Sequence, residues 1–194
     1  MMLPAYDAVI LAGGAASRLA GADKPTLLVG DLSMLDRVVA AVTEATQIIC
    51  VGPQRPTSQP VVWTREVPPG GGPVAALAAG LSLVSELTAV VLAADLPFVA
   101  KAVAPLRAAL PGHDAAVLVD AQGRDQPLVA AYDVGALRAA LTTLGTPTGA
   151  SMRAVLALLN CARVPDPGGE RPAAYDCDTL TELQHARRIE EGRL

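Results

Sequence analysis

Short apolar segments alternate along this chain with longer segments that are rich in alanine and leucine. The apolar segments of strand length are residues 8–11, 47–51, 60–63, 89–93, 115–119 and 128–131. Helical periodicity marks residues 34–45, 74–84, 99–110, 135–144 and 151–159. Apolar strands that alternate with helices are typical of parallel sheets covered on both faces. The pattern predicts an α/β fold, a three-layer α/β/α sandwich with a Rossmann-like, mostly parallel sheet and right-handed crossovers.

The C-terminal part of the chain is more polar. Residues 165–172 (PDPGGERP) read as a turn-rich loop rather than a domain linker, because too little chain follows to fold alone. Asp178 or Thr179 has the character of an N-cap, and the acidic first turn after it predicts a charged surface helix over residues 181–191. We therefore expect a single domain over residues 1–194.

Composition and charge narrow the class of protein. Of the 194 residues 52% are hydrophobic but only 3% aromatic, so the core must consist mainly of Ala, Val and Leu. The net charge of −4 and the pI near 5.1 argue against a general binder of nucleic acid or acidic membranes, which needs a basic face. Any phosphate chemistry must therefore use a local group of cations.

The cysteines and the apolar runs indicate a cytoplasmic protein. Cys50, Cys161 and Cys177 are three scattered residues without metal-ligand spacing, which favours reduced thiols that pack as small apolar side chains. The apolar start has no basic segment before it, so no signal peptide is expected. Residues 87–94 are apolar but too few to span a bilayer, so no membrane association is expected.

Candidate chemistry begins directly after the first predicted strand, in the stretch VILAGGAASRLAGADKPTLLV at residues 9–29. Glycines at the carboxyl end of a parallel strand let backbone amides approach a phosphate. Arg18 offers a bidentate contact and Lys24 a mobile point charge, both among small residues. The spacing is neither G-x-G-x-x-G nor G-x-x-x-x-G-K-[ST]. An ordinary turn with two solvated cations is the competing interpretation.

Two further places at the expected sheet edge carry polar groups. Asp95 follows an apolar strand, where a carboxylate either ligates a divalent cation or caps the turn before Pro97. Pro73 fixes the start of a helix after three glycines, and its free amides would suit a nucleotide. Glu66 lies just ahead and either accepts from the guanine N1 and N2 donors or is solvated.

The opening stretch resembles a known family. Leu11, Ala12, Gly13 and Gly14, then Arg18, Gly21, Asp23 and Lys24, match the LAGG-x-x-x-R-x-x-G-x-D-K signature of nucleotidylyltransferases, and the molybdenum cofactor guanylyltransferases are most similar. Ala20 departs from the family, which commonly has glycine there. The resemblance implies the sheet of nucleotide-diphospho-sugar transferases and Arg18, Lys24 and Asp95 as catalytic residues. The nucleotide-binding residues it implies are Leu11, Ala12, Gly13, Gly14, Arg18, Lys24, Glu66, Pro73 and Asp95.

Four later segments extend the resemblance in the order of the family. Residues 69–77 resemble its G-P-L-A-G segment beside guanine, residues 94–98 its D-x-P metal corner, and residues 123–128 its R-x-[HQ]-P segment near the pterin. Residues 176–179 resemble its terminal N-x-N-T motif, with aspartates in place of both asparagines. The implied substrate-binding residues are Asp125, Gln126 and Arg153. Asp95 and Asp178 would hold Mg²⁺, provided that the end of the chain folds back over the sheet edge.

The activity that this resemblance implies is transfer of GMP from GTP to molybdopterin, with release of pyrophosphate and Mg²⁺ as cofactor. The resemblance also implies transient contact with the maturation proteins of molybdoenzymes. No nucleic acid partner is expected. Two alternatives are open. One is a sister nucleotidyltransferase with another base or acceptor, such as a molybdopterin cytidylyltransferase, which the aspartates at residues 176–178 favour. The other is a non-catalytic nucleotide-binding domain, against which the joint presence of Arg18, Lys24 and Asp95 argues.

Overall fold

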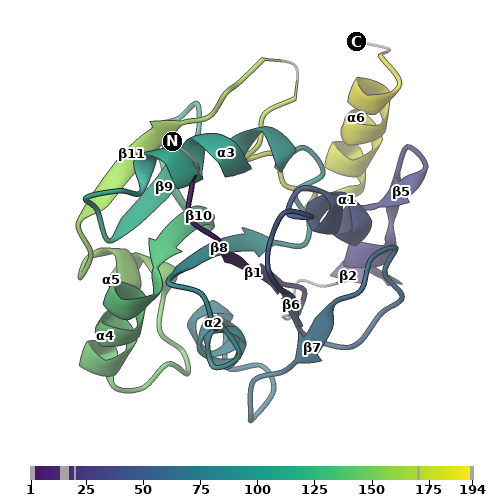
Figure 1. The fold of residues 1–194 in the computed structure, drawn as a ribbon. Coiled ribbons are helices and arrows are strands. Elements are labelled where there is room, and N and C mark those ends of the chain that lie inside the picture. The colour runs from purple at the N-terminus through teal and green to yellow at the C-terminus, as the bar shows by residue number, and fades with distance from the viewer. Residues whose placement is uncertain (1–2, 14–17, 20, 170, 193–194) are drawn as a thin grey trace.

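The centre of the molecule is a seven-stranded β-sheet, seen here in a computed structural model that describes residues 3–13, 18–19, 21–169 and 171–192. Its strands are β1 (Asp7–Leu11), β6 (Ile48–Val51), β7 (Val62–Thr64), β8 (Thr88–Ala93), β9 (Ala115–Val119), β10 (Asp125–Asp133) and β11 (Cys161–Pro165). The order across the sheet is β11-β9-β10-β8-β1-β6-β7 (Figure 1). All six predicted strands are present in this sheet.

Strand direction follows the connections. β1 pairs in parallel with β6 and β8, with Val9 opposite both Ile49 and Val91. β10 runs antiparallel to both β8 and β9, because the short turn at residues 120–124 returns the chain directly beside β9. A tight turn can join only antiparallel neighbours, whereas a parallel neighbour needs a long crossover. The sheet is therefore mixed but mostly parallel.

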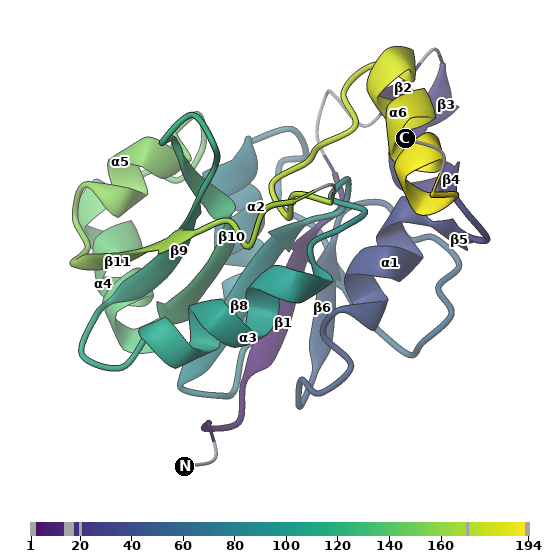
Figure 2. The same ribbon diagram turned by 90° about the horizontal axis from the view of Figure 1, so that it is seen from above.

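Helices cover both faces of the sheet. They are α1 (Met34–Ala40), α2 (Pro73–Leu81), α3 (Ala100–Ala109), α4 (Val134–Leu144), α5 (Met152–Leu156) and α6 (Leu180–Glu190). Ala8 and Ile10 of β1 pack in one apolar cluster with α1 and α3, while Val9 and Leu11 pack in another with α2, α4 and α5. Figures 1 and 2 show these two helix layers on opposite sides of the sheet. The predicted α/β/α sandwich is confirmed.

Small side chains let α2 approach the sheet closely. A Cβ on Gly80 would lie 2.6 Å from Cγ1 of Val9 and 2.8 Å from Cγ2 of Val51. Only a residue without a side chain fits between the helix and these two central strands. The C-terminal half of α2 therefore packs directly on β1 and β6.

Several boundaries differ from the sequence expectations. The helix predicted over residues 34–45 ends as α1 at Ala40, and the apolar pattern continues through turns in which Val42 and Ala45 donate to carbonyls three residues back. The helix predicted over residues 151–159 ends as α5 at Leu156 for the same reason, with Leu158 and Leu159 in such turns. Turns of this kind keep side chains at spacing three on one face, so the pattern alone does not separate them from α-helix.

Three edge and peripheral parts of the fold were not predicted from the sequence pattern. β11 pairs in parallel with β9 and ends at Pro165, which the edge of a sheet tolerates. Two small hairpins, β2 (Arg18–Leu19) with β3 (Ala22–Asp23) and β4 (Leu28–Val29) with β5 (Leu32–Ser33), flank the 3₁₀ turn η1 (Lys24–Thr26). Two-residue strands leave no period-2 pattern long enough to recognise.

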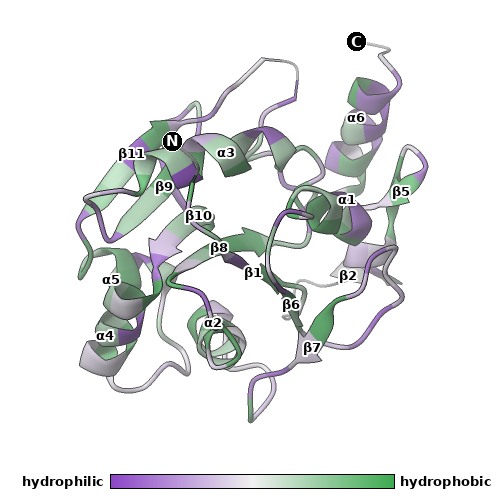
Figure 3. Cartoon of the chain, viewed as in Figure 1, coloured by the Kyte–Doolittle hydropathy of each residue, from purple (hydrophilic) through white to green (hydrophobic). Residues whose placement is uncertain are grey.

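The sequence predicts a charged surface helix at this place, but one face of α6 is buried. Its Leu183, Ala186 and Ile189 are buried in a third cluster with Val29 and Phe98, while its other residues are mostly polar (Figure 3). Arg187 donates from Nε to the carbonyl of Leu28 at 2.8 Å. The C-terminal part of the chain thus packs against the β4–β5 hairpin (Figure 2). None of the helices in the described part of the chain is both long and apolar enough for a membrane span.

Candidate functional site

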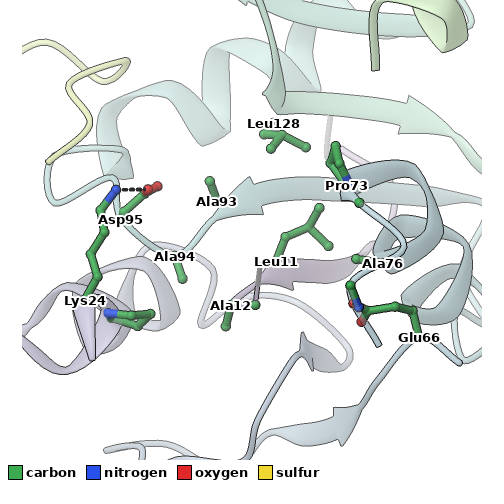
Figure 4. A pocket seen from close by; sticks show the side chains of 14 residues that line it. Leu11, Ala12, Lys24, Glu66, Pro73, Ala76, Ala93, Ala94, Asp95 and Leu128 are labelled. Atoms are coloured by element: carbon green, nitrogen blue, oxygen red, sulfur yellow. Dashed lines mark hydrogen bonds and ion pairs between the residues drawn. The ribbon is translucent and has the colours of Figure 1, made fainter. Parts of the chain in front are cut away.

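A cavity of about 420 Å³ opens at the carboxyl ends of β1 and β8. Its lining residues are Leu11, Ala12, Gly13, Lys24, Pro25, Glu66, Gly70, Gly72, Pro73, Ala76, Ala93, Ala94, Asp95 and Leu128. Seven of the nine predicted nucleotide-binding residues are in this set. Figure 4 shows Lys24 and Asp95 at one end, Glu66 and Pro73 at the other, and the strand ends between them. The cavity is therefore charged at both ends and apolar in the middle.

The charged end is organised around Lys24. Its Nζ lies 2.6 Å from Oδ2 of Asp95 and 2.5 Å from Oδ1 of Asp178. The Lys24 side chain is only 3% exposed, whereas those of Asp95 and Asp178 are 27% and 59% exposed. Burial by itself lowers the pKa of Lys24, but the hydrogen bonds and negative charges of Asp178 and Asp95 outweigh burial and raise it. Lys24 is held as an ammonium ion in the wall of the cavity at this end.

Three separate parts of the chain supply these groups. Lys24 begins η1, where Pro25 fixes the backbone and Thr26 Oγ1 donates to the carbonyl of Asp23. Asp95 lies in the turn that follows β8, and Asp178 follows the buried Cys177. The end of the chain therefore folds back over the sheet edge, which is the condition under which Asp95 and Asp178 were expected to meet.

Asp178 does not cap the last helix. The N-cap of α6 is Thr179, whose hydroxyl accepts from the amide of Glu182, and the Glu182 carboxylate accepts in turn from the amide of Thr179. This reciprocal arrangement satisfies the helix start without Asp178. The Asp178 carboxylate is therefore available for the charged end of the cavity.

A third carboxylate adds to the negative charge there. Burial and then the negative charges of Asp178 and Asp95 raise the pKa of Asp176. A hard divalent cation prefers carboxylate oxygens as ligands, and its charge would relieve the repulsion between these carboxylates. No group of three or more His, Cys, Asp or Glu side chains arranged to hold a metal occurs in the ranges that the structure describes. A cation at Asp95 and Asp178 would therefore complete its coordination with oxygens from a ligand.

The opposite end of the cavity combines Glu66 with the start of α2. Glu66 is 8% exposed, and its Oε1 accepts from the amide of Gly70 at 2.9 Å. Gly72 is the N-cap of α2 with φ of +90°, a conformation that side chains disfavour, and Pro73 occupies the first turn. The amides of a first helical turn lack partners within the helix and can bind a ligand.

Of the two adjacent glycines after β1, the structure describes only the first. Gly13 is exposed and lines the cavity, whereas Gly14 lies outside the described residues, as does the side chain of Arg18. A Cβ on Gly13 would make an ordinary contact, 3.4 Å from the Cα of Gly52. Packing in this fold therefore does not by itself require glycine at residue 13. The proposed roles of Gly14 and Arg18 stay predictions.

The predicted acceptor residues do not line the cavity. Asp125 and Gln126 begin β10, where Asp125 accepts from Nε of Arg163 at 2.7 Å and Gln126 donates to Asp120 at 2.9 Å. Arg153 lies in the short helix α5. The cavity is bounded on that side by Leu128 of β10. The assignment of these three residues to a second substrate stays a prediction.

Sequence reasoning missed Arg55, which lies between β6 and β7 and is 7% exposed. Its guanidinium makes a bidentate pair with Asp23 and donates to the carbonyl of Ala12. Asp23 immediately precedes Lys24, and Ala12 lines the cavity. An arginine four residues after a predicted parallel strand is the signal that could have drawn attention to it, because such strand ends converge on the site.

Most of the chain matches a family of nucleotidyltransferases. The family model of the MobA-like NTP transferase domain matches residues 8–188. No match was found among curated proteins. Among solved structures, the molybdopterin-guanine dinucleotide biosynthesis protein A of Archaeoglobus fulgidus is 20% identical with a TM-score of 0.75, and the match covers 96% of this chain and 99% of that one.

Two other solved structures have the same fold. A nucleotidyl transferase of Methanothermobacter is 16% identical with a TM-score of 0.78, over 98% of this chain and 99% of that one. The 2-C-methyl-D-erythritol 4-phosphate cytidylyltransferase of Thermus thermophilus is 20% identical with a TM-score of 0.71, over 98% and 100%. These neighbours show the fold, and the family model covers nearly the full chain. The protein belongs to the family of MobA-like NTP transferases.

Proposed function

We propose that this nucleotidyltransferase moves the GMP group of GTP onto the terminal phosphate of molybdopterin and releases pyrophosphate. The observation that carries the proposal is the polarity of the cavity. Lys24 with Asp95 forms one end, and Glu66 with the start of α2 forms the other (Figure 4). Asp178 is not part of the cavity lining but contacts the same Lys24 ammonium. A nucleoside triphosphate has the same polarity, with an anionic chain at one end and a hydrogen-bonding base at the other.

At the phosphate end, the chain supplies a cation and two carboxylates. The Lys24 ammonium would neutralise charge on the transferred and leaving phosphates, with Arg18 as a second cation, and the backbone at Gly13 and Gly14 would border the triphosphate. Asp95 and Asp178 would hold Mg²⁺, which when bound withdraws charge from phosphate oxygens. Asp95 lines the cavity, Asp178 contacts the same Lys24 ammonium from outside that lining, and the hard oxygen donors of both carboxylates fit this ion.

The chemistry needs no nucleophile from the protein. An oxygen of the molybdopterin phosphate attacks the α-phosphorus of GTP, the new P–O bond forms, and the bond from the α-phosphorus to the bridging oxygen breaks. Pyrophosphate leaves with the electron pair of that bond. Because the attacking phosphate is already anionic near neutral pH, positioning and charge neutralisation carry the catalysis. The second substrate would approach from the side of β10 and α5, where Asp125, Gln126 and Arg153 lie.

At the base end, Glu66 is the proposed determinant of guanine. Oε1 of Glu66 already accepts from the amide of Gly70, and the carboxylate lines the cavity. A second carboxylate oxygen offers an acceptor to the N1 and N2 donors of guanine. A base without these donors would leave the second oxygen of this carboxylate without a partner, which costs about 1–3 kcal/mol.

A cytidylyltransferase is the second candidate. It is favoured by Asp176 and Asp178, which stand where the guanylyltransferases that the sequence resembles have asparagines. The experiment that decides is pyrophosphate release from GTP, CTP, ATP and UTP, each with and without molybdopterin. We expect release from GTP in the presence of molybdopterin. Preference for CTP would establish the second candidate, and release that is independent of molybdopterin would exclude it as the acceptor.

A further inference from the structure

The buried guanidinium group of Arg55 connects two segments of the chain, one at Ala12 and one at Asp23. Its Nε and Nη2 donate to the Asp23 carboxylate at 2.5 and 2.7 Å, and Nη1 donates to the carbonyls of Ala12 and Pro53 at 2.6 and 3.0 Å. The Arg55 side chain is 5% exposed. All three guanidinium nitrogens therefore have acceptors, and none is directed at the cavity.

Two of the three partners of Arg55, Ala12 and Asp23, adjoin the two sides of the phosphate end of the cavity. Ala12 directly follows β1 and precedes Gly13, and Asp23 precedes Lys24. Ala12 is tied to the sheet by its own amide, which donates to the carbonyl of Val51 at 2.8 Å. Asp23 is tied to η1, because its carbonyl accepts from Thr26. The Arg55 guanidinium thus joins a fixed point of the sheet to the turn that carries Lys24.

We infer that Arg55 is a positioning residue that sets the distance between the backbone at Gly13 and the Lys24 ammonium. Through this distance it sets the affinity for the triphosphate, and in that respect the inference rests on the proposed function. A planar guanidinium can satisfy a carboxylate through two nitrogens and a carbonyl through the third at the same time. A lysine can keep the charge but cannot hold this fixed geometry. The role is thus specific to arginine and does not require contact with the ligand.

The test compares Arg55→Lys with Arg37→Lys. Arg37 is a matched control: its side chain is 14% exposed, Nε donates to the carbonyl of Val29 at 2.6 Å, and Nη2 pairs with Glu190 at 2.6 Å. Neither of these partners lines the cavity, whereas Ala12, a partner of Arg55, does. We expect Arg55→Lys to weaken binding of Mg·GTP by at least about tenfold, the lower end of what removing an orienting partner costs. Arg37→Lys should lower the melting temperature and leave the affinity for GTP within about twofold of the original.

A readout without ligand separates this inference from the proposed function. In the ligand-free protein, Arg55→Lys should shift the NMR amide signals of Gly13 and Lys24 and leave that of Gly72 at the other end of the cavity unchanged. If the original protein bound no nucleoside triphosphate, the proposed function would fail, while these amide signals would still decide the role of Arg55. Unchanged Gly13 and Lys24 signals would overturn the inference.

A second variant covers the case in which Arg55→Lys does not fold. Asp23→Asn keeps Arg55 and its bond to Ala12, and the Asp23 side chain is 42% exposed, so the variant should remain folded. It should shift the same two amide signals and weaken Mg·GTP binding several-fold. In a purely structural role, the affinity for GTP would fall in Asp23→Asn or Arg55→Lys only in proportion to the fall in melting temperature. That result would also overturn the inference.

Discussion

Lys24 and Asp178 are separated by 154 positions in the chain, yet Nζ of Lys24 lies 2.5 Å from Oδ1 of Asp178. The same ammonium contacts Asp95 at 2.6 Å. The side chain thus joins the turn after the first hairpin, the end of a central strand and the segment before the last helix. A divalent cation at Asp95 and Asp178 would use the same carboxylate oxygens that Lys24 contacts. Binding of the ion would therefore release the Lys24 ammonium, and we expect it to be coupled to movement of Lys24 toward the phosphates.

Replacement of Lys24 should affect turnover more than binding. We expect Lys24→Ala to lower kcat by about a hundredfold or more, the size typical of losing one group that stabilises transition-state charge, with a smaller change in KM. Lys101→Ala is the control, because Lys101 is exposed on α3, and it should leave both constants unchanged. Steady-state kinetics with GTP gives both values. Equal and small effects of the two replacements would make Lys24 an ordinary structural lysine.

Asp178 should act through the metal ion and not through the helix. Asp178→Asn should raise the Mg²⁺ concentration needed for half-maximal activity and for half-maximal binding of Mg²⁺ in calorimetry, with little change in melting temperature.

The control for Asp178 is its neighbour. Thr179→Ala removes the N-cap of α6 and should cost about 1 kcal/mol of stability without changing the requirement for Mg²⁺. An Asp178→Asn protein with unaltered Mg²⁺ binding would remove Asp178 from the proposed metal site.

Asp176 should make the stability of the folded protein depend on pH. Burial and then Asp178 and Asp95 raise its pKa above the ordinary 3.8, so the folded state binds a proton more tightly than the unfolded state. The corresponding stability is present below that ordinary value and is lost as pH rises through the folded pKa. Asp176→Asn removes this loss and should melt at a higher temperature than the original protein at pH 7.

The gain from Asp176→Asn should vanish in acid, where Asp176 is protonated in both states. Melting curves between pH 3 and pH 7 measure it, with Asp31→Asn, at an exposed position, as the control. A gain that persisted unchanged at pH 3 would mean that packing, and not charge, causes it.

The sequence patterns located most of this site because its parts are local. The glycines after β1, the Asp95 turn and the Pro73 helix start each lie at an element boundary that is visible in the sequence, and the structure brings Gly13, Asp95 and Pro73 to one cavity. The pairing of Arg55 with Asp23 could not be foreseen in this way. It depends on β6 lying directly beside β1, which is a long-range contact that no local periodicity encodes.

The same distinction explains the elements of the fold that were missed. β11 (CARVP) contains an arginine and a proline and lies at the sheet edge, so it lacks the continuous apolar pattern of the central strands. The burial of α6 depends on the β4–β5 hairpin and on Phe98, which are remote in sequence. Its spacing of Leu183, Ala186 and Ile189 is the local signal that predicts one buried face.

Glu66 should determine the preference for guanine. Glu66→Gln can keep an acceptor for the amide of Gly70 but presents a donor where the N1 and N2 groups of guanine need an acceptor. We expect its affinity for GTP to fall about tenfold, equivalent to the loss of one hydrogen bond to a charged group. ITP lacks the N2 amino group of guanine. The original protein should therefore bind GTP more tightly than ITP, whereas Glu66→Gln should bind the two nucleotides about equally. Full discrimination between GTP and ITP in Glu66→Gln would exclude Glu66 as the base determinant.

Transfer of labelled phosphate tests the central claim most directly. GTP labelled at the α-phosphate is incubated with the protein, Mg²⁺ and molybdopterin, and the label is followed in the pterin product while pyrophosphate is measured. We predict one labelled phosphate in the pterin product for each pyrophosphate released, with the label joined through a new phosphate–phosphate bond. Pyrophosphate released while the label stays in free GMP, or label that enters no pterin product, would contradict the proposed function.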